Sequence, residues 1–289
     1  LEKIFDILKL TGIFRDKLLS IHANPDISDI LAIMERDGID FITDEDESYP
    51  DRLKYIFAPP LYLYVKGRLK PYSNGLGVIG SRNCTLYGKE IALSFSKILA
   101  MHGINIISGM AKGVDGYAHE GALAGGGYTI AVLGFGACEC YPAEHRGLKK
   151  RIEQNGCLVS EYHPTASGNP RFFPARNRII AALSDGLLVV EAAKKSGTII
   201  TVDFALSIGK TIYAVPGRIG DPMSEGCLEL IKTGSKPLTD PGDILKDFGY
   251  ELKKPARSAG LRLEKKQRAV YERIKFQPKS TDEILSGLE

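Results

Sequence analysis

The chain has 289 residues, of which 44% are hydrophobic and 25% are charged. This length gives room for one large α/β domain with one or two small ones, and the composition is that of an ordinary soluble globular protein. The net charge of +3 is too small to indicate nucleic-acid binding by itself, so any such argument depends on where the basic residues lie.

Cysteine usage and hydropathy indicate which metal sites, membrane segments and cellular location to expect. The five cysteines include one close pair, Cys138 and Cys140, and no histidine pair stands at zinc-finger spacing. We therefore expect reduced thiols, no metal site and no cofactor. No apolar stretch reaches the roughly 18 residues of a membrane-spanning helix, and no signal peptide is apparent. The expected location is the cytoplasm, without membrane contact.

The first 70 residues precede the main domain. Residues 1–45 carry apolar residues at helical spacing, interrupted by turn signals, and predict a small helical domain. This domain is either a packing module or a binding module. Residues 46–70 are rich in proline and tyrosine and hold one strand-like segment, 61–65. We interpret them as the bridge into the main domain.

From residue 76 onward, short apolar strands alternate with helical stretches. The predicted strands are 76–79, 104–108, 128–133, 157–160, 187–190 and 211–215, and the predicted helices lie near 86–101, 115–124, 143–154, 177–183, 199–207 and 226–232. This alternation predicts a doubly wound, mostly parallel sheet with helices on both faces. Ligands of such sheets bind outside the carboxyl ends of the strands.

Small, hydroxyl and basic residues follow five of these strands. The segments are Gly80-Ser81-Arg82, the run from Ser108 through Gly109 and Lys112 to Asp115, Gly134-Phe135-Gly136, the run from Glu191 to Thr198, and Pro216-Gly217-Arg218. Glycines let the backbone approach a ligand closely. Since the carboxyl ends of parallel strands meet at one edge, these segments predict a binding rim.

The stretch 172–201 concentrates the features of an anion site. It opens with two aromatic residues and Arg176-Asn177-Arg178, and its strand leads through Lys194 and Lys195 into Ser196-Gly197-Thr198. A strand that ends in Ser-Gly-Thr before a helix places free backbone N–H groups and a positive dipole at one point. The expected ligand group is phosphate.

Two patterns near the rim have simpler readings. Residues 75–80 match G-x-G-x-x-G, but the first two glycines precede or lie inside the strand, so the pattern does not indicate a dinucleotide site. Asp115 is either an acid/base group or the residue that opens the helix after Gly113, and we prefer the second interpretation.

The C-terminal part changes in composition. Residues 246–260 read as a basic linker, and between residues 253 and 273 there are eight Lys or Arg against two Glu. Residues 261–289 read as two helices separated by a turn, which is too little to bury a core.

With these motifs in place, the chain resembles the bacterial DNA-processing protein A family (DprA/Smf) over roughly residues 45–245. The motifs that carry the resemblance are Tyr49-Pro50, Pro60-Leu61-Tyr62, Gly80-Ser81-Arg82, the run Ser108 to Asp115, Tyr141-Pro142-Ala143-Glu144-His145, the run Phe173 to Ile180, Ser196-Gly197-Thr198 and Val215-Pro216-Gly217. Several motifs in family order make this a specific signal.

The resemblance implies an extended Rossmann-like domain at residues 46–245 that binds single-stranded DNA and forms a homodimer. It implies protection of incoming DNA in natural transformation and loading of a RecA-type recombinase, without catalysis. Residues 1–45 would correspond to a sterile-alpha-motif-like domain, and residues 261–289 to the first two helices of a winged-helix-like domain, apparently truncated.

The residues themselves agree with a nucleic-acid site. The basic candidates for phosphate contacts are Arg82, Lys112, Arg171, Arg176, Arg178, Lys194 and Lys195; the candidates for backbone, hydroxyl or amide contacts are Ser81, Gly109, Asn177, Ser196, Gly197 and Thr198; the candidates for base stacking are Phe172 and Phe173. Either aromatic can instead belong to the core. Arg176 and Arg178 point in opposite senses if extended, so we expect at least one to be an ion-pair partner of Glu191 or Asp185.

Two other functions use a similar scaffold. A Rossmann-like nucleoside-monophosphate phosphoribohydrolase needs an acidic residue beside the phosphate, which Glu191 or Asp115 could supply. Those proteins, however, carry Pro-Gly-Gly-x-Gly-Thr where this chain has Ala-Lys-Lys-Ser-Gly-Thr. A nucleotide sensor is the third reading. Turnover of a nucleotide would favour the enzyme, and length-dependent binding of oligonucleotides would favour the mediator.

Overall fold

The computed structural model describes residues 25–250 together with Gln267, Val270 and Thr281. The chain divides into two compact units, residues 1–248 and 249–289. The helices predicted before residue 25, the linker beyond residue 250 and the winged-helix-like segment lie outside the described residues, apart from the three isolated positions. The first unit holds the sheet and is described here.

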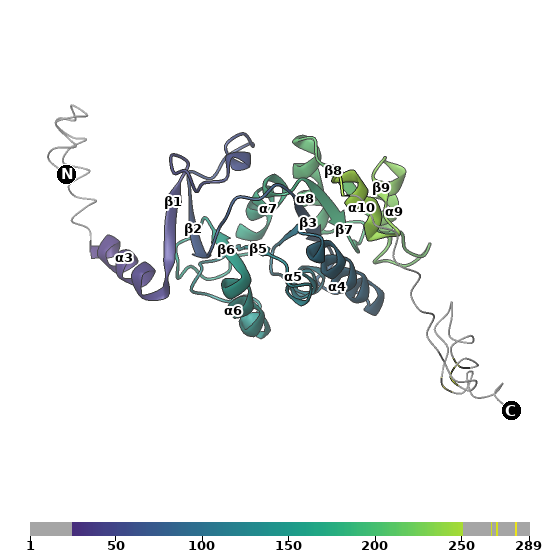
Figure 1. Cartoon of the computed structure of the whole chain (residues 1–289), viewed down its shortest axis with the longest axis horizontal. Coiled ribbons are helices and arrows are strands. Elements are labelled where there is room, and N and C mark those ends of the chain that lie inside the picture. Colours follow the sequence, from purple (N-terminus) through teal and green to yellow (C-terminus); the bar gives the residue numbers. More distant parts are fainter. Residues whose placement is uncertain (1–24, 251–266, 268–269, 271–280, 282–289) are drawn as a thin grey trace. The chain divides into compact units, whose positions relative to one another are not determined.

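A mixed sheet of nine strands in the described residues organises this unit (Figure 1). Its strands are β1 (Ile39–Thr43), β2 (Tyr62–Gly67), β3 (Gly75–Ile79), β4 (Asn105–Ser108), β5 (Thr129–Val132), β6 (Gly156–Ser160), β7 (Gly186–Val189), β8 (Thr211–Ala214) and β9 (Lys236–Pro237). Their order is β1-β2-β6-β5-β4-β3-β7-β8-β9. The strands from β3 to β9 run parallel, and β2 is antiparallel to both β1 and β6.

Helices cover both faces of the sheet because its central strands are apolar on both sides. Every residue of β3, β4, β5, β6 and β7 is buried, as expected for parallel strands between two helical layers. The helices of one layer are α4 (Leu86–Met101), α5 (Val114–Ala124) and α6 (Arg146–Asn155), and those of the other are α7 (Phe172–Leu183) and α8 (Gly197–Ser207) (Figure 1). The remaining elements are α3 (Pro25–Asp37), η1 (Asp51–Leu53), η2 (Ala143–His145), α9 (Glu225–Lys232) and α10 (Pro241–Asp247).

The core lies between the sheet and these layers. Under α7 and α8 it contains Ile179, Leu183 and Val202, packed with strand residues such as Ile107 and Val189. A second cluster lies beside α6, where Leu148 and Ile152 meet Leu133 and Leu158. No helix in the described part of the chain is both long and apolar enough to span a bilayer.

The strand order places a topological switch point between β3 and β7. From β3 the chain adds β4, β5 and β6 on one side, and it then crosses to β7 and β8 on the other side of β3. The loops that leave the carboxyl ends of β3 and β7 therefore separate, and a crevice opens between them.

The predicted doubly wound α/β fold is confirmed, and the six predicted central strands are present with ends shifted by one residue at most sites. One part of the helical prediction for residues 1–45 is wrong, since Ile39–Thr43 is an edge strand paired with β2. Ile39 and Ile42 are three residues apart, a spacing that places them on one face of a helix but on opposite faces of a strand. Gly38, at φ +61°, ends α3 in the left-handed conformation that helix C-termini favour.

Candidate functional site

A cavity of about 500 Å³ opens at the switch point, at the carboxyl ends of β3 and β7. The loop after β3, the N-terminal half of α7 and the start of α8 form its walls. The lining residues include Gly80, Ser81, Arg82, Asp115, Tyr141, Phe173, Arg176, Asn177, Ser196, Gly197 and Thr198. Eight of the predicted site residues are thus brought together from segments more than 100 positions apart.

The loop after β3 is anchored before it reaches the cavity. The Ser81 amide donates to the carbonyl of Glu191 (2.8 Å), the residue just beyond β7. Gly113, at φ +81°, packs so closely on the Ser81 carbonyl that a Cβ would collide with it. The exposed Arg82 guanidinium lies over the Phe173 ring, 5.2 Å from its centroid, a cation–π arrangement. A basic group and an aromatic face therefore meet at the cavity entrance.

α7 begins at Phe172, five residues earlier than predicted. Pro174 is compatible with this start because the first-turn amides of a helix have no intrahelical acceptor. Helical spacing places Phe173, Asn177 and Ile180 on the side that lines the cavity.

The two adjacent phenylalanines of α7 have different surroundings. The Phe172 ring stacks on Tyr162, with centroids 4.0 Å apart. The half-buried Phe173 ring instead lies beside Tyr141, with centroids 5.4 Å apart, and both rings line the cavity. Phe173 therefore reaches the cavity, with Arg82 over its ring, while Phe172 is stacked on Tyr162 and does not line the cavity.

Arg176 lies at the floor of the cavity and is 3% exposed. Its guanidinium donates to the carbonyls of Gly109 (2.8 Å) and Val132, which follow β4 and end β5. A Cβ at Gly109 would collide with this guanidinium, so the glycine makes room for it. Burial lowers the pKa of Arg176 to about 10, partly offset by Asp115, and the group stays charged at neutral pH. Arg176 braces two strand ends, and Gly109 lies behind it instead of lining the cavity.

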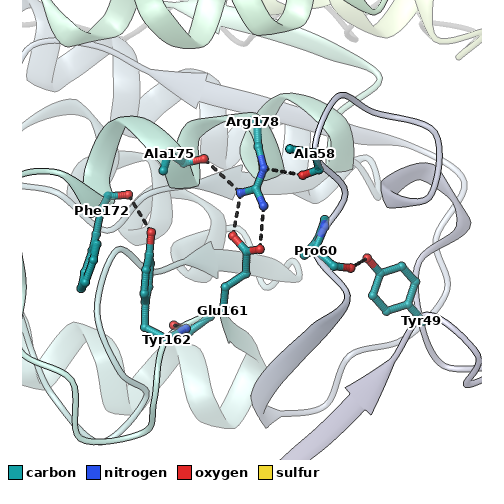
Figure 2. A network of polar contacts seen from close by, with 9 residues as sticks. Tyr49, Ala58, Pro60, Glu161, Tyr162, Phe172, Ala175 and Arg178 are labelled. Atoms are coloured by element: carbon teal, nitrogen blue, oxygen red, sulfur yellow. Dashed lines mark hydrogen bonds and ion pairs between the residues drawn. The ribbon is translucent and has the colours of Figure 1, made fainter.

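Arg178 points toward Glu161 and the Ala58 carbonyl (Figure 2), and it is not among the residues that line the cavity. It forms a two-bond ion pair with Glu161, with both N–O distances 2.6 Å, and its Nε donates to the carbonyl of Ala58 (2.8 Å). The side chain is 13% exposed. Arg178 therefore ties α7 to the loops after β6 and before β2. The expected partners Glu191 and Asp185 are wrong, because a helix directs positions 176 and 178 to different elements.

The start of α8 has the features of an anion site. Ser196 is the N-cap residue, but its side chain makes no capping bond, and its Oγ is shielded from solvent without a partner among the described residues. The first turn contains no acidic residue, and the space beside Gly197 is open. Ser196, Gly197 and Thr198, at the positive end of the helix, therefore line the cavity beside a hydroxyl that has no hydrogen-bond partner among the described residues.

The two carboxylates suggested as acid/base groups have structural partners. Glu191 accepts hydrogen bonds from the amide (2.8 Å) and hydroxyl (2.6 Å) of Thr85, the N-cap of α4, and it packs against Gly88 in that helix. Asp115, in the first turn of α5, accepts from the Gly109 amide (3.1 Å). Burial raises the pKa of Asp115, and the charge of Arg176 opposes this shift. Both carboxylates therefore hold helix starts in place.

The remaining predicted basic residues lie outside the cavity lining. Lys112 is exposed and pairs with Glu144 at 3.6 Å, and Arg171, Lys194 and Lys195 are exposed on the loops before α7 and α8. Tyr141 lines the cavity but was absent from the predicted site. The available signal was its place in the Tyr-Pro-Ala-Glu-His motif.

We expect the change of Arg178 to methionine to lower the free energy of unfolding by about 2–3 kcal/mol, since it leaves the largely buried Glu161 unpaired. Urea unfolding of Arg178→Met measures this loss, and a double-mutant cycle that also changes Glu161 measures the coupling energy between the two residues. The control is Lys232→Met, which removes an exposed pair at 3.8 Å and should cost at most about 0.5 kcal/mol. Unchanged stability together with weaker oligonucleotide binding would instead make Arg178 a direct phosphate ligand.

Comparison with known proteins shows that the chain is similar to members of one protein family. Residues 40–249 match the model of the family described as DNA recombination-mediator protein A. The chain is 36% identical over 226 residues to the DNA processing protein DprA of Bacillus subtilis, covering 78% of this chain and 76% of that protein. It is 41% identical over 228 residues to protein Smf of Escherichia coli, covering 78% of this chain and 61% of that protein.

Two solved structures share the fold. The DNA processing protein A of Streptococcus pneumoniae aligns with a TM-score of 0.70 and 36% identity, covering 76% of this chain and 78% of that one. The DNA processing protein A of Helicobacter pylori aligns with a TM-score of 0.65 and 29% identity, covering 72% of this chain and 94% of that one. The study of the Helicobacter pylori protein concerns its single-stranded DNA binding mode.

Proposed function

The chain belongs to the DNA recombination-mediator protein A family, and we propose that it binds single-stranded DNA through the cavity at the β3–β7 switch point. The observation that carries this proposal is the start of α8, where the residues that carry the first donors of the helix, Ser196, Gly197 and Thr198, line the cavity and the Ser196 Oγ has no hydrogen-bond partner among the described residues. A phosphate group would satisfy these donors and the helix dipole together.

The aromatic wall explains why the DNA would be single-stranded. Phe173 and Tyr141 lie beside the phosphate position, and Tyr141 is 49% exposed. An unpaired base can turn its face onto such a ring, whereas the faces of bases in a duplex are covered by their neighbours. Stacking accepts any base, so the expected preference is for strand state and not for sequence.

Exposed basic residues around the entrance extend the contact to neighbouring phosphates. Arg171, Lys194 and Lys195 are the candidates on the loops before α7 and α8, and Lys112 would join them by releasing Glu144. We leave Arg178 out of the direct contacts because its donors are taken by Glu161, Ala58 and Ala175.

We propose that this site binds and does not catalyse. Glu191 and Asp115 already accept hydrogen bonds that hold α4 and α5, so neither is placed as a free general base. The family description names a DNA recombination mediator. We propose that the chain protects incoming DNA in natural transformation and helps to load a RecA-type recombinase, as the resemblance implies. We propose that the chain does so as a homodimer, which sedimentation of the full chain would test.

Changing Arg82 to alanine should weaken binding to oligonucleotides of every sequence alike, because the residue would contact phosphate. It should also reduce the slope of log K against log salt by about 0.7, the contribution of one phosphate contact on a single strand. Fluorescence anisotropy of labelled single-stranded and duplex oligonucleotides, titrated with salt, measures both effects.

Lys97→Ala is the matched control for Arg82→Ala. It removes the same charge from an exposed position of α4, three turns beyond the N-cap Thr85. An unchanged salt slope in Arg82→Ala would remove Arg82 from the interface. Equal affinity of the unchanged chain for single strands and duplex would overturn the proposal, and nucleoside monophosphates would then be tested as ligands and substrates.

A further inference from the structure

The outer edge of β1 is open for backbone pairing. β1 pairs with β2 alone within the described residues, and it ends the sheet (Figure 1). The Asp44 amide bonds to the Leu61 carbonyl (3.2 Å), which makes this opposite pair a hydrogen-bonded one. Because hydrogen-bonded and non-bonded pairs alternate in an antiparallel ladder, the N–H and C=O groups of Ile39, Phe41 and Thr43 point outward.

One of these outward donors is closed by the chain itself. The Thr43 amide donates to the Asp46 carboxylate at 2.6 Å. The backbone groups of Ile39 and Phe41 have no such cover in the described residues. Natural sheet edges are usually protected, so a segment that is left open marks a place where another strand can add.

An exposed aromatic cluster lies along this edge. Phe41 stacks on Tyr62 with ring centroids 5.1 Å apart, and both rings meet the edge or face of Tyr64 at 5.3 and 5.7 Å. Phe41 is 44% exposed and Tyr62 is 39% exposed. Neighbouring Leu61, at the start of β2, is 68% exposed. A strand added beside β1 would bury apolar side chains on this face.

The surroundings of the edge are acidic. Residues 38–51 contain six Asp or Glu and no Lys or Arg, and Asp40, Asp44, Glu45 and Glu47 are exposed. The nearby basic residues are engaged: Arg36 pairs with Asp37 (2.6 Å), Lys54 with Asp51 (3.0 Å) and Lys66 with Glu153 (4.0 Å). Asp40 lies on the opposite face of β1 from Phe41, since successive side chains of a strand alternate.

We propose that the β1 edge is a docking site for an extended segment of a partner protein in which basic side chains alternate with apolar ones. The backbone of that segment would pair with Ile39 and Phe41. Its apolar side chains would lie on Phe41 and Tyr62, and its basic side chains would face Asp40 and the acidic turn at 44–47. The same acidic charge repels phosphate. We therefore do not expect this surface to bind DNA, unlike the cavity and the exposed lysines on the loop before α8.

The probe is a fluorescein-labelled seven-residue peptide in which lysine alternates with valine, titrated against the full chain by anisotropy. The comparison peptides are one in which glutamate replaces lysine and one of the same composition with all lysines first. We expect binding of the alternating lysine peptide alone. Asp40→Lys should weaken it about fivefold, since it exchanges an attraction for a repulsion, and Phe41→Ala about threefold.

Phe41→Pro separates backbone pairing from side-chain contact. Proline is tolerated at edge positions whose N–H faces outward, and it removes that donor together with the ring. Its loss of affinity should exceed that of Phe41→Ala. Circular dichroism checks that the proline variant folds; if it does not fold, Asp40→Lys and Phe41→Ala decide the test.

Glu90→Lys and Arg82→Ala are the controls. Glu90→Lys makes the same charge change as Asp40→Lys on the exposed side of α4, and Arg82→Ala alters the cavity entrance. Both should bind the peptide as the unchanged chain does. Equal affinity for the two alternating peptides, or no effect of Asp40→Lys and Phe41→Ala, would overturn the proposal. A concentration-dependent dimer that Phe41→Lys dissociates in sedimentation would also overturn it, because a second copy would then be the occupant.

Discussion

Replacing Arg176 with methionine should lower the free energy of unfolding by about 3–5 kcal/mol, the usual cost of removing one partner from a buried charged network. The change leaves the carbonyls of Gly109 and Val132 without their donor, and it removes the positive charge that most lowers the pKa of Asp115. Methionine fills part of the same volume. The loss of unfolding free energy therefore comes mainly from the missing polar contacts and less from an empty cavity. Urea or thermal unfolding followed by circular dichroism measures it.

The loss of unfolding free energy caused by Arg176→Met should be smaller at low pH than at neutral pH. Burial already raises the pKa of Asp115, and loss of the arginine removes a cause that opposes this shift. A carboxyl with a raised folded-state pKa favours the fold through its protonated form. That contribution is complete below the ordinary value of 3.8 and is lost as the pH rises through the raised value. The variant should therefore lose less stability in acid than at neutral pH.

Arg171→Met is the matched control, since it removes an exposed arginine just before the same helix. Its stability should stay within about 0.5 kcal/mol of the unchanged chain. If Arg176→Met were equally mild in stability but abolished oligonucleotide binding, Arg176 would be a phosphate ligand and not a brace between β4 and β5.

Replacing Gly197 with aspartate should move stability and DNA binding in opposite directions. A carboxylate in the first turn of α8 complements the helix dipole and should stabilise the fold by about 0.3–1 kcal/mol. The space beside Gly197 is open, so the side chain fits without a clash. The same carboxylate would occupy the proposed phosphate position and repel DNA, and we expect at least about a tenfold loss of affinity, or 1.4 kcal/mol.

Two matched variants separate charge from size at position 197. Gly197→Asn has nearly the shape of aspartate without its charge, and Gly197→Ala adds a single methyl group. Both should keep most of the affinity for single-stranded oligonucleotides. A DNA affinity of Gly197→Asp equal to that of Gly197→Asn would show that no phosphate binds at the start of α8.

The sequence predicts the sheet well because its central strands are short apolar runs that are separated by helices and turn residues. The antiparallel edge strand β1 is harder to predict from the sequence. β1 is five residues long, follows α3 directly and has Ile39 and Ile42 at a spacing that also suits a helix. Its strand state depends on pairing with β2, a tertiary contact that local patterns do not encode.

The candidate site could be predicted in its location but only partly in its roles. Strand ends indicated the rim, and Arg82, Phe173 and Ser196 do line one cavity. The difference between Phe172 and Phe173, by contrast, depends on Tyr162 ten residues earlier in the chain. The partner of Arg178 depends on how α7 packs against the loop after β6, a tertiary contact that local sequence patterns do not encode.

The contact of Glu191 with Gly88 limits how these two positions can change over evolutionary time. Any side chain at position 88 would place its Cβ against the Glu191 carboxylate, which is held there by Thr85. A chain that replaces this glycine must at the same time shorten or redirect the acid, 103 positions away. Substitutions at the two positions should therefore occur together, although one lies in a helix and the other just beyond a strand.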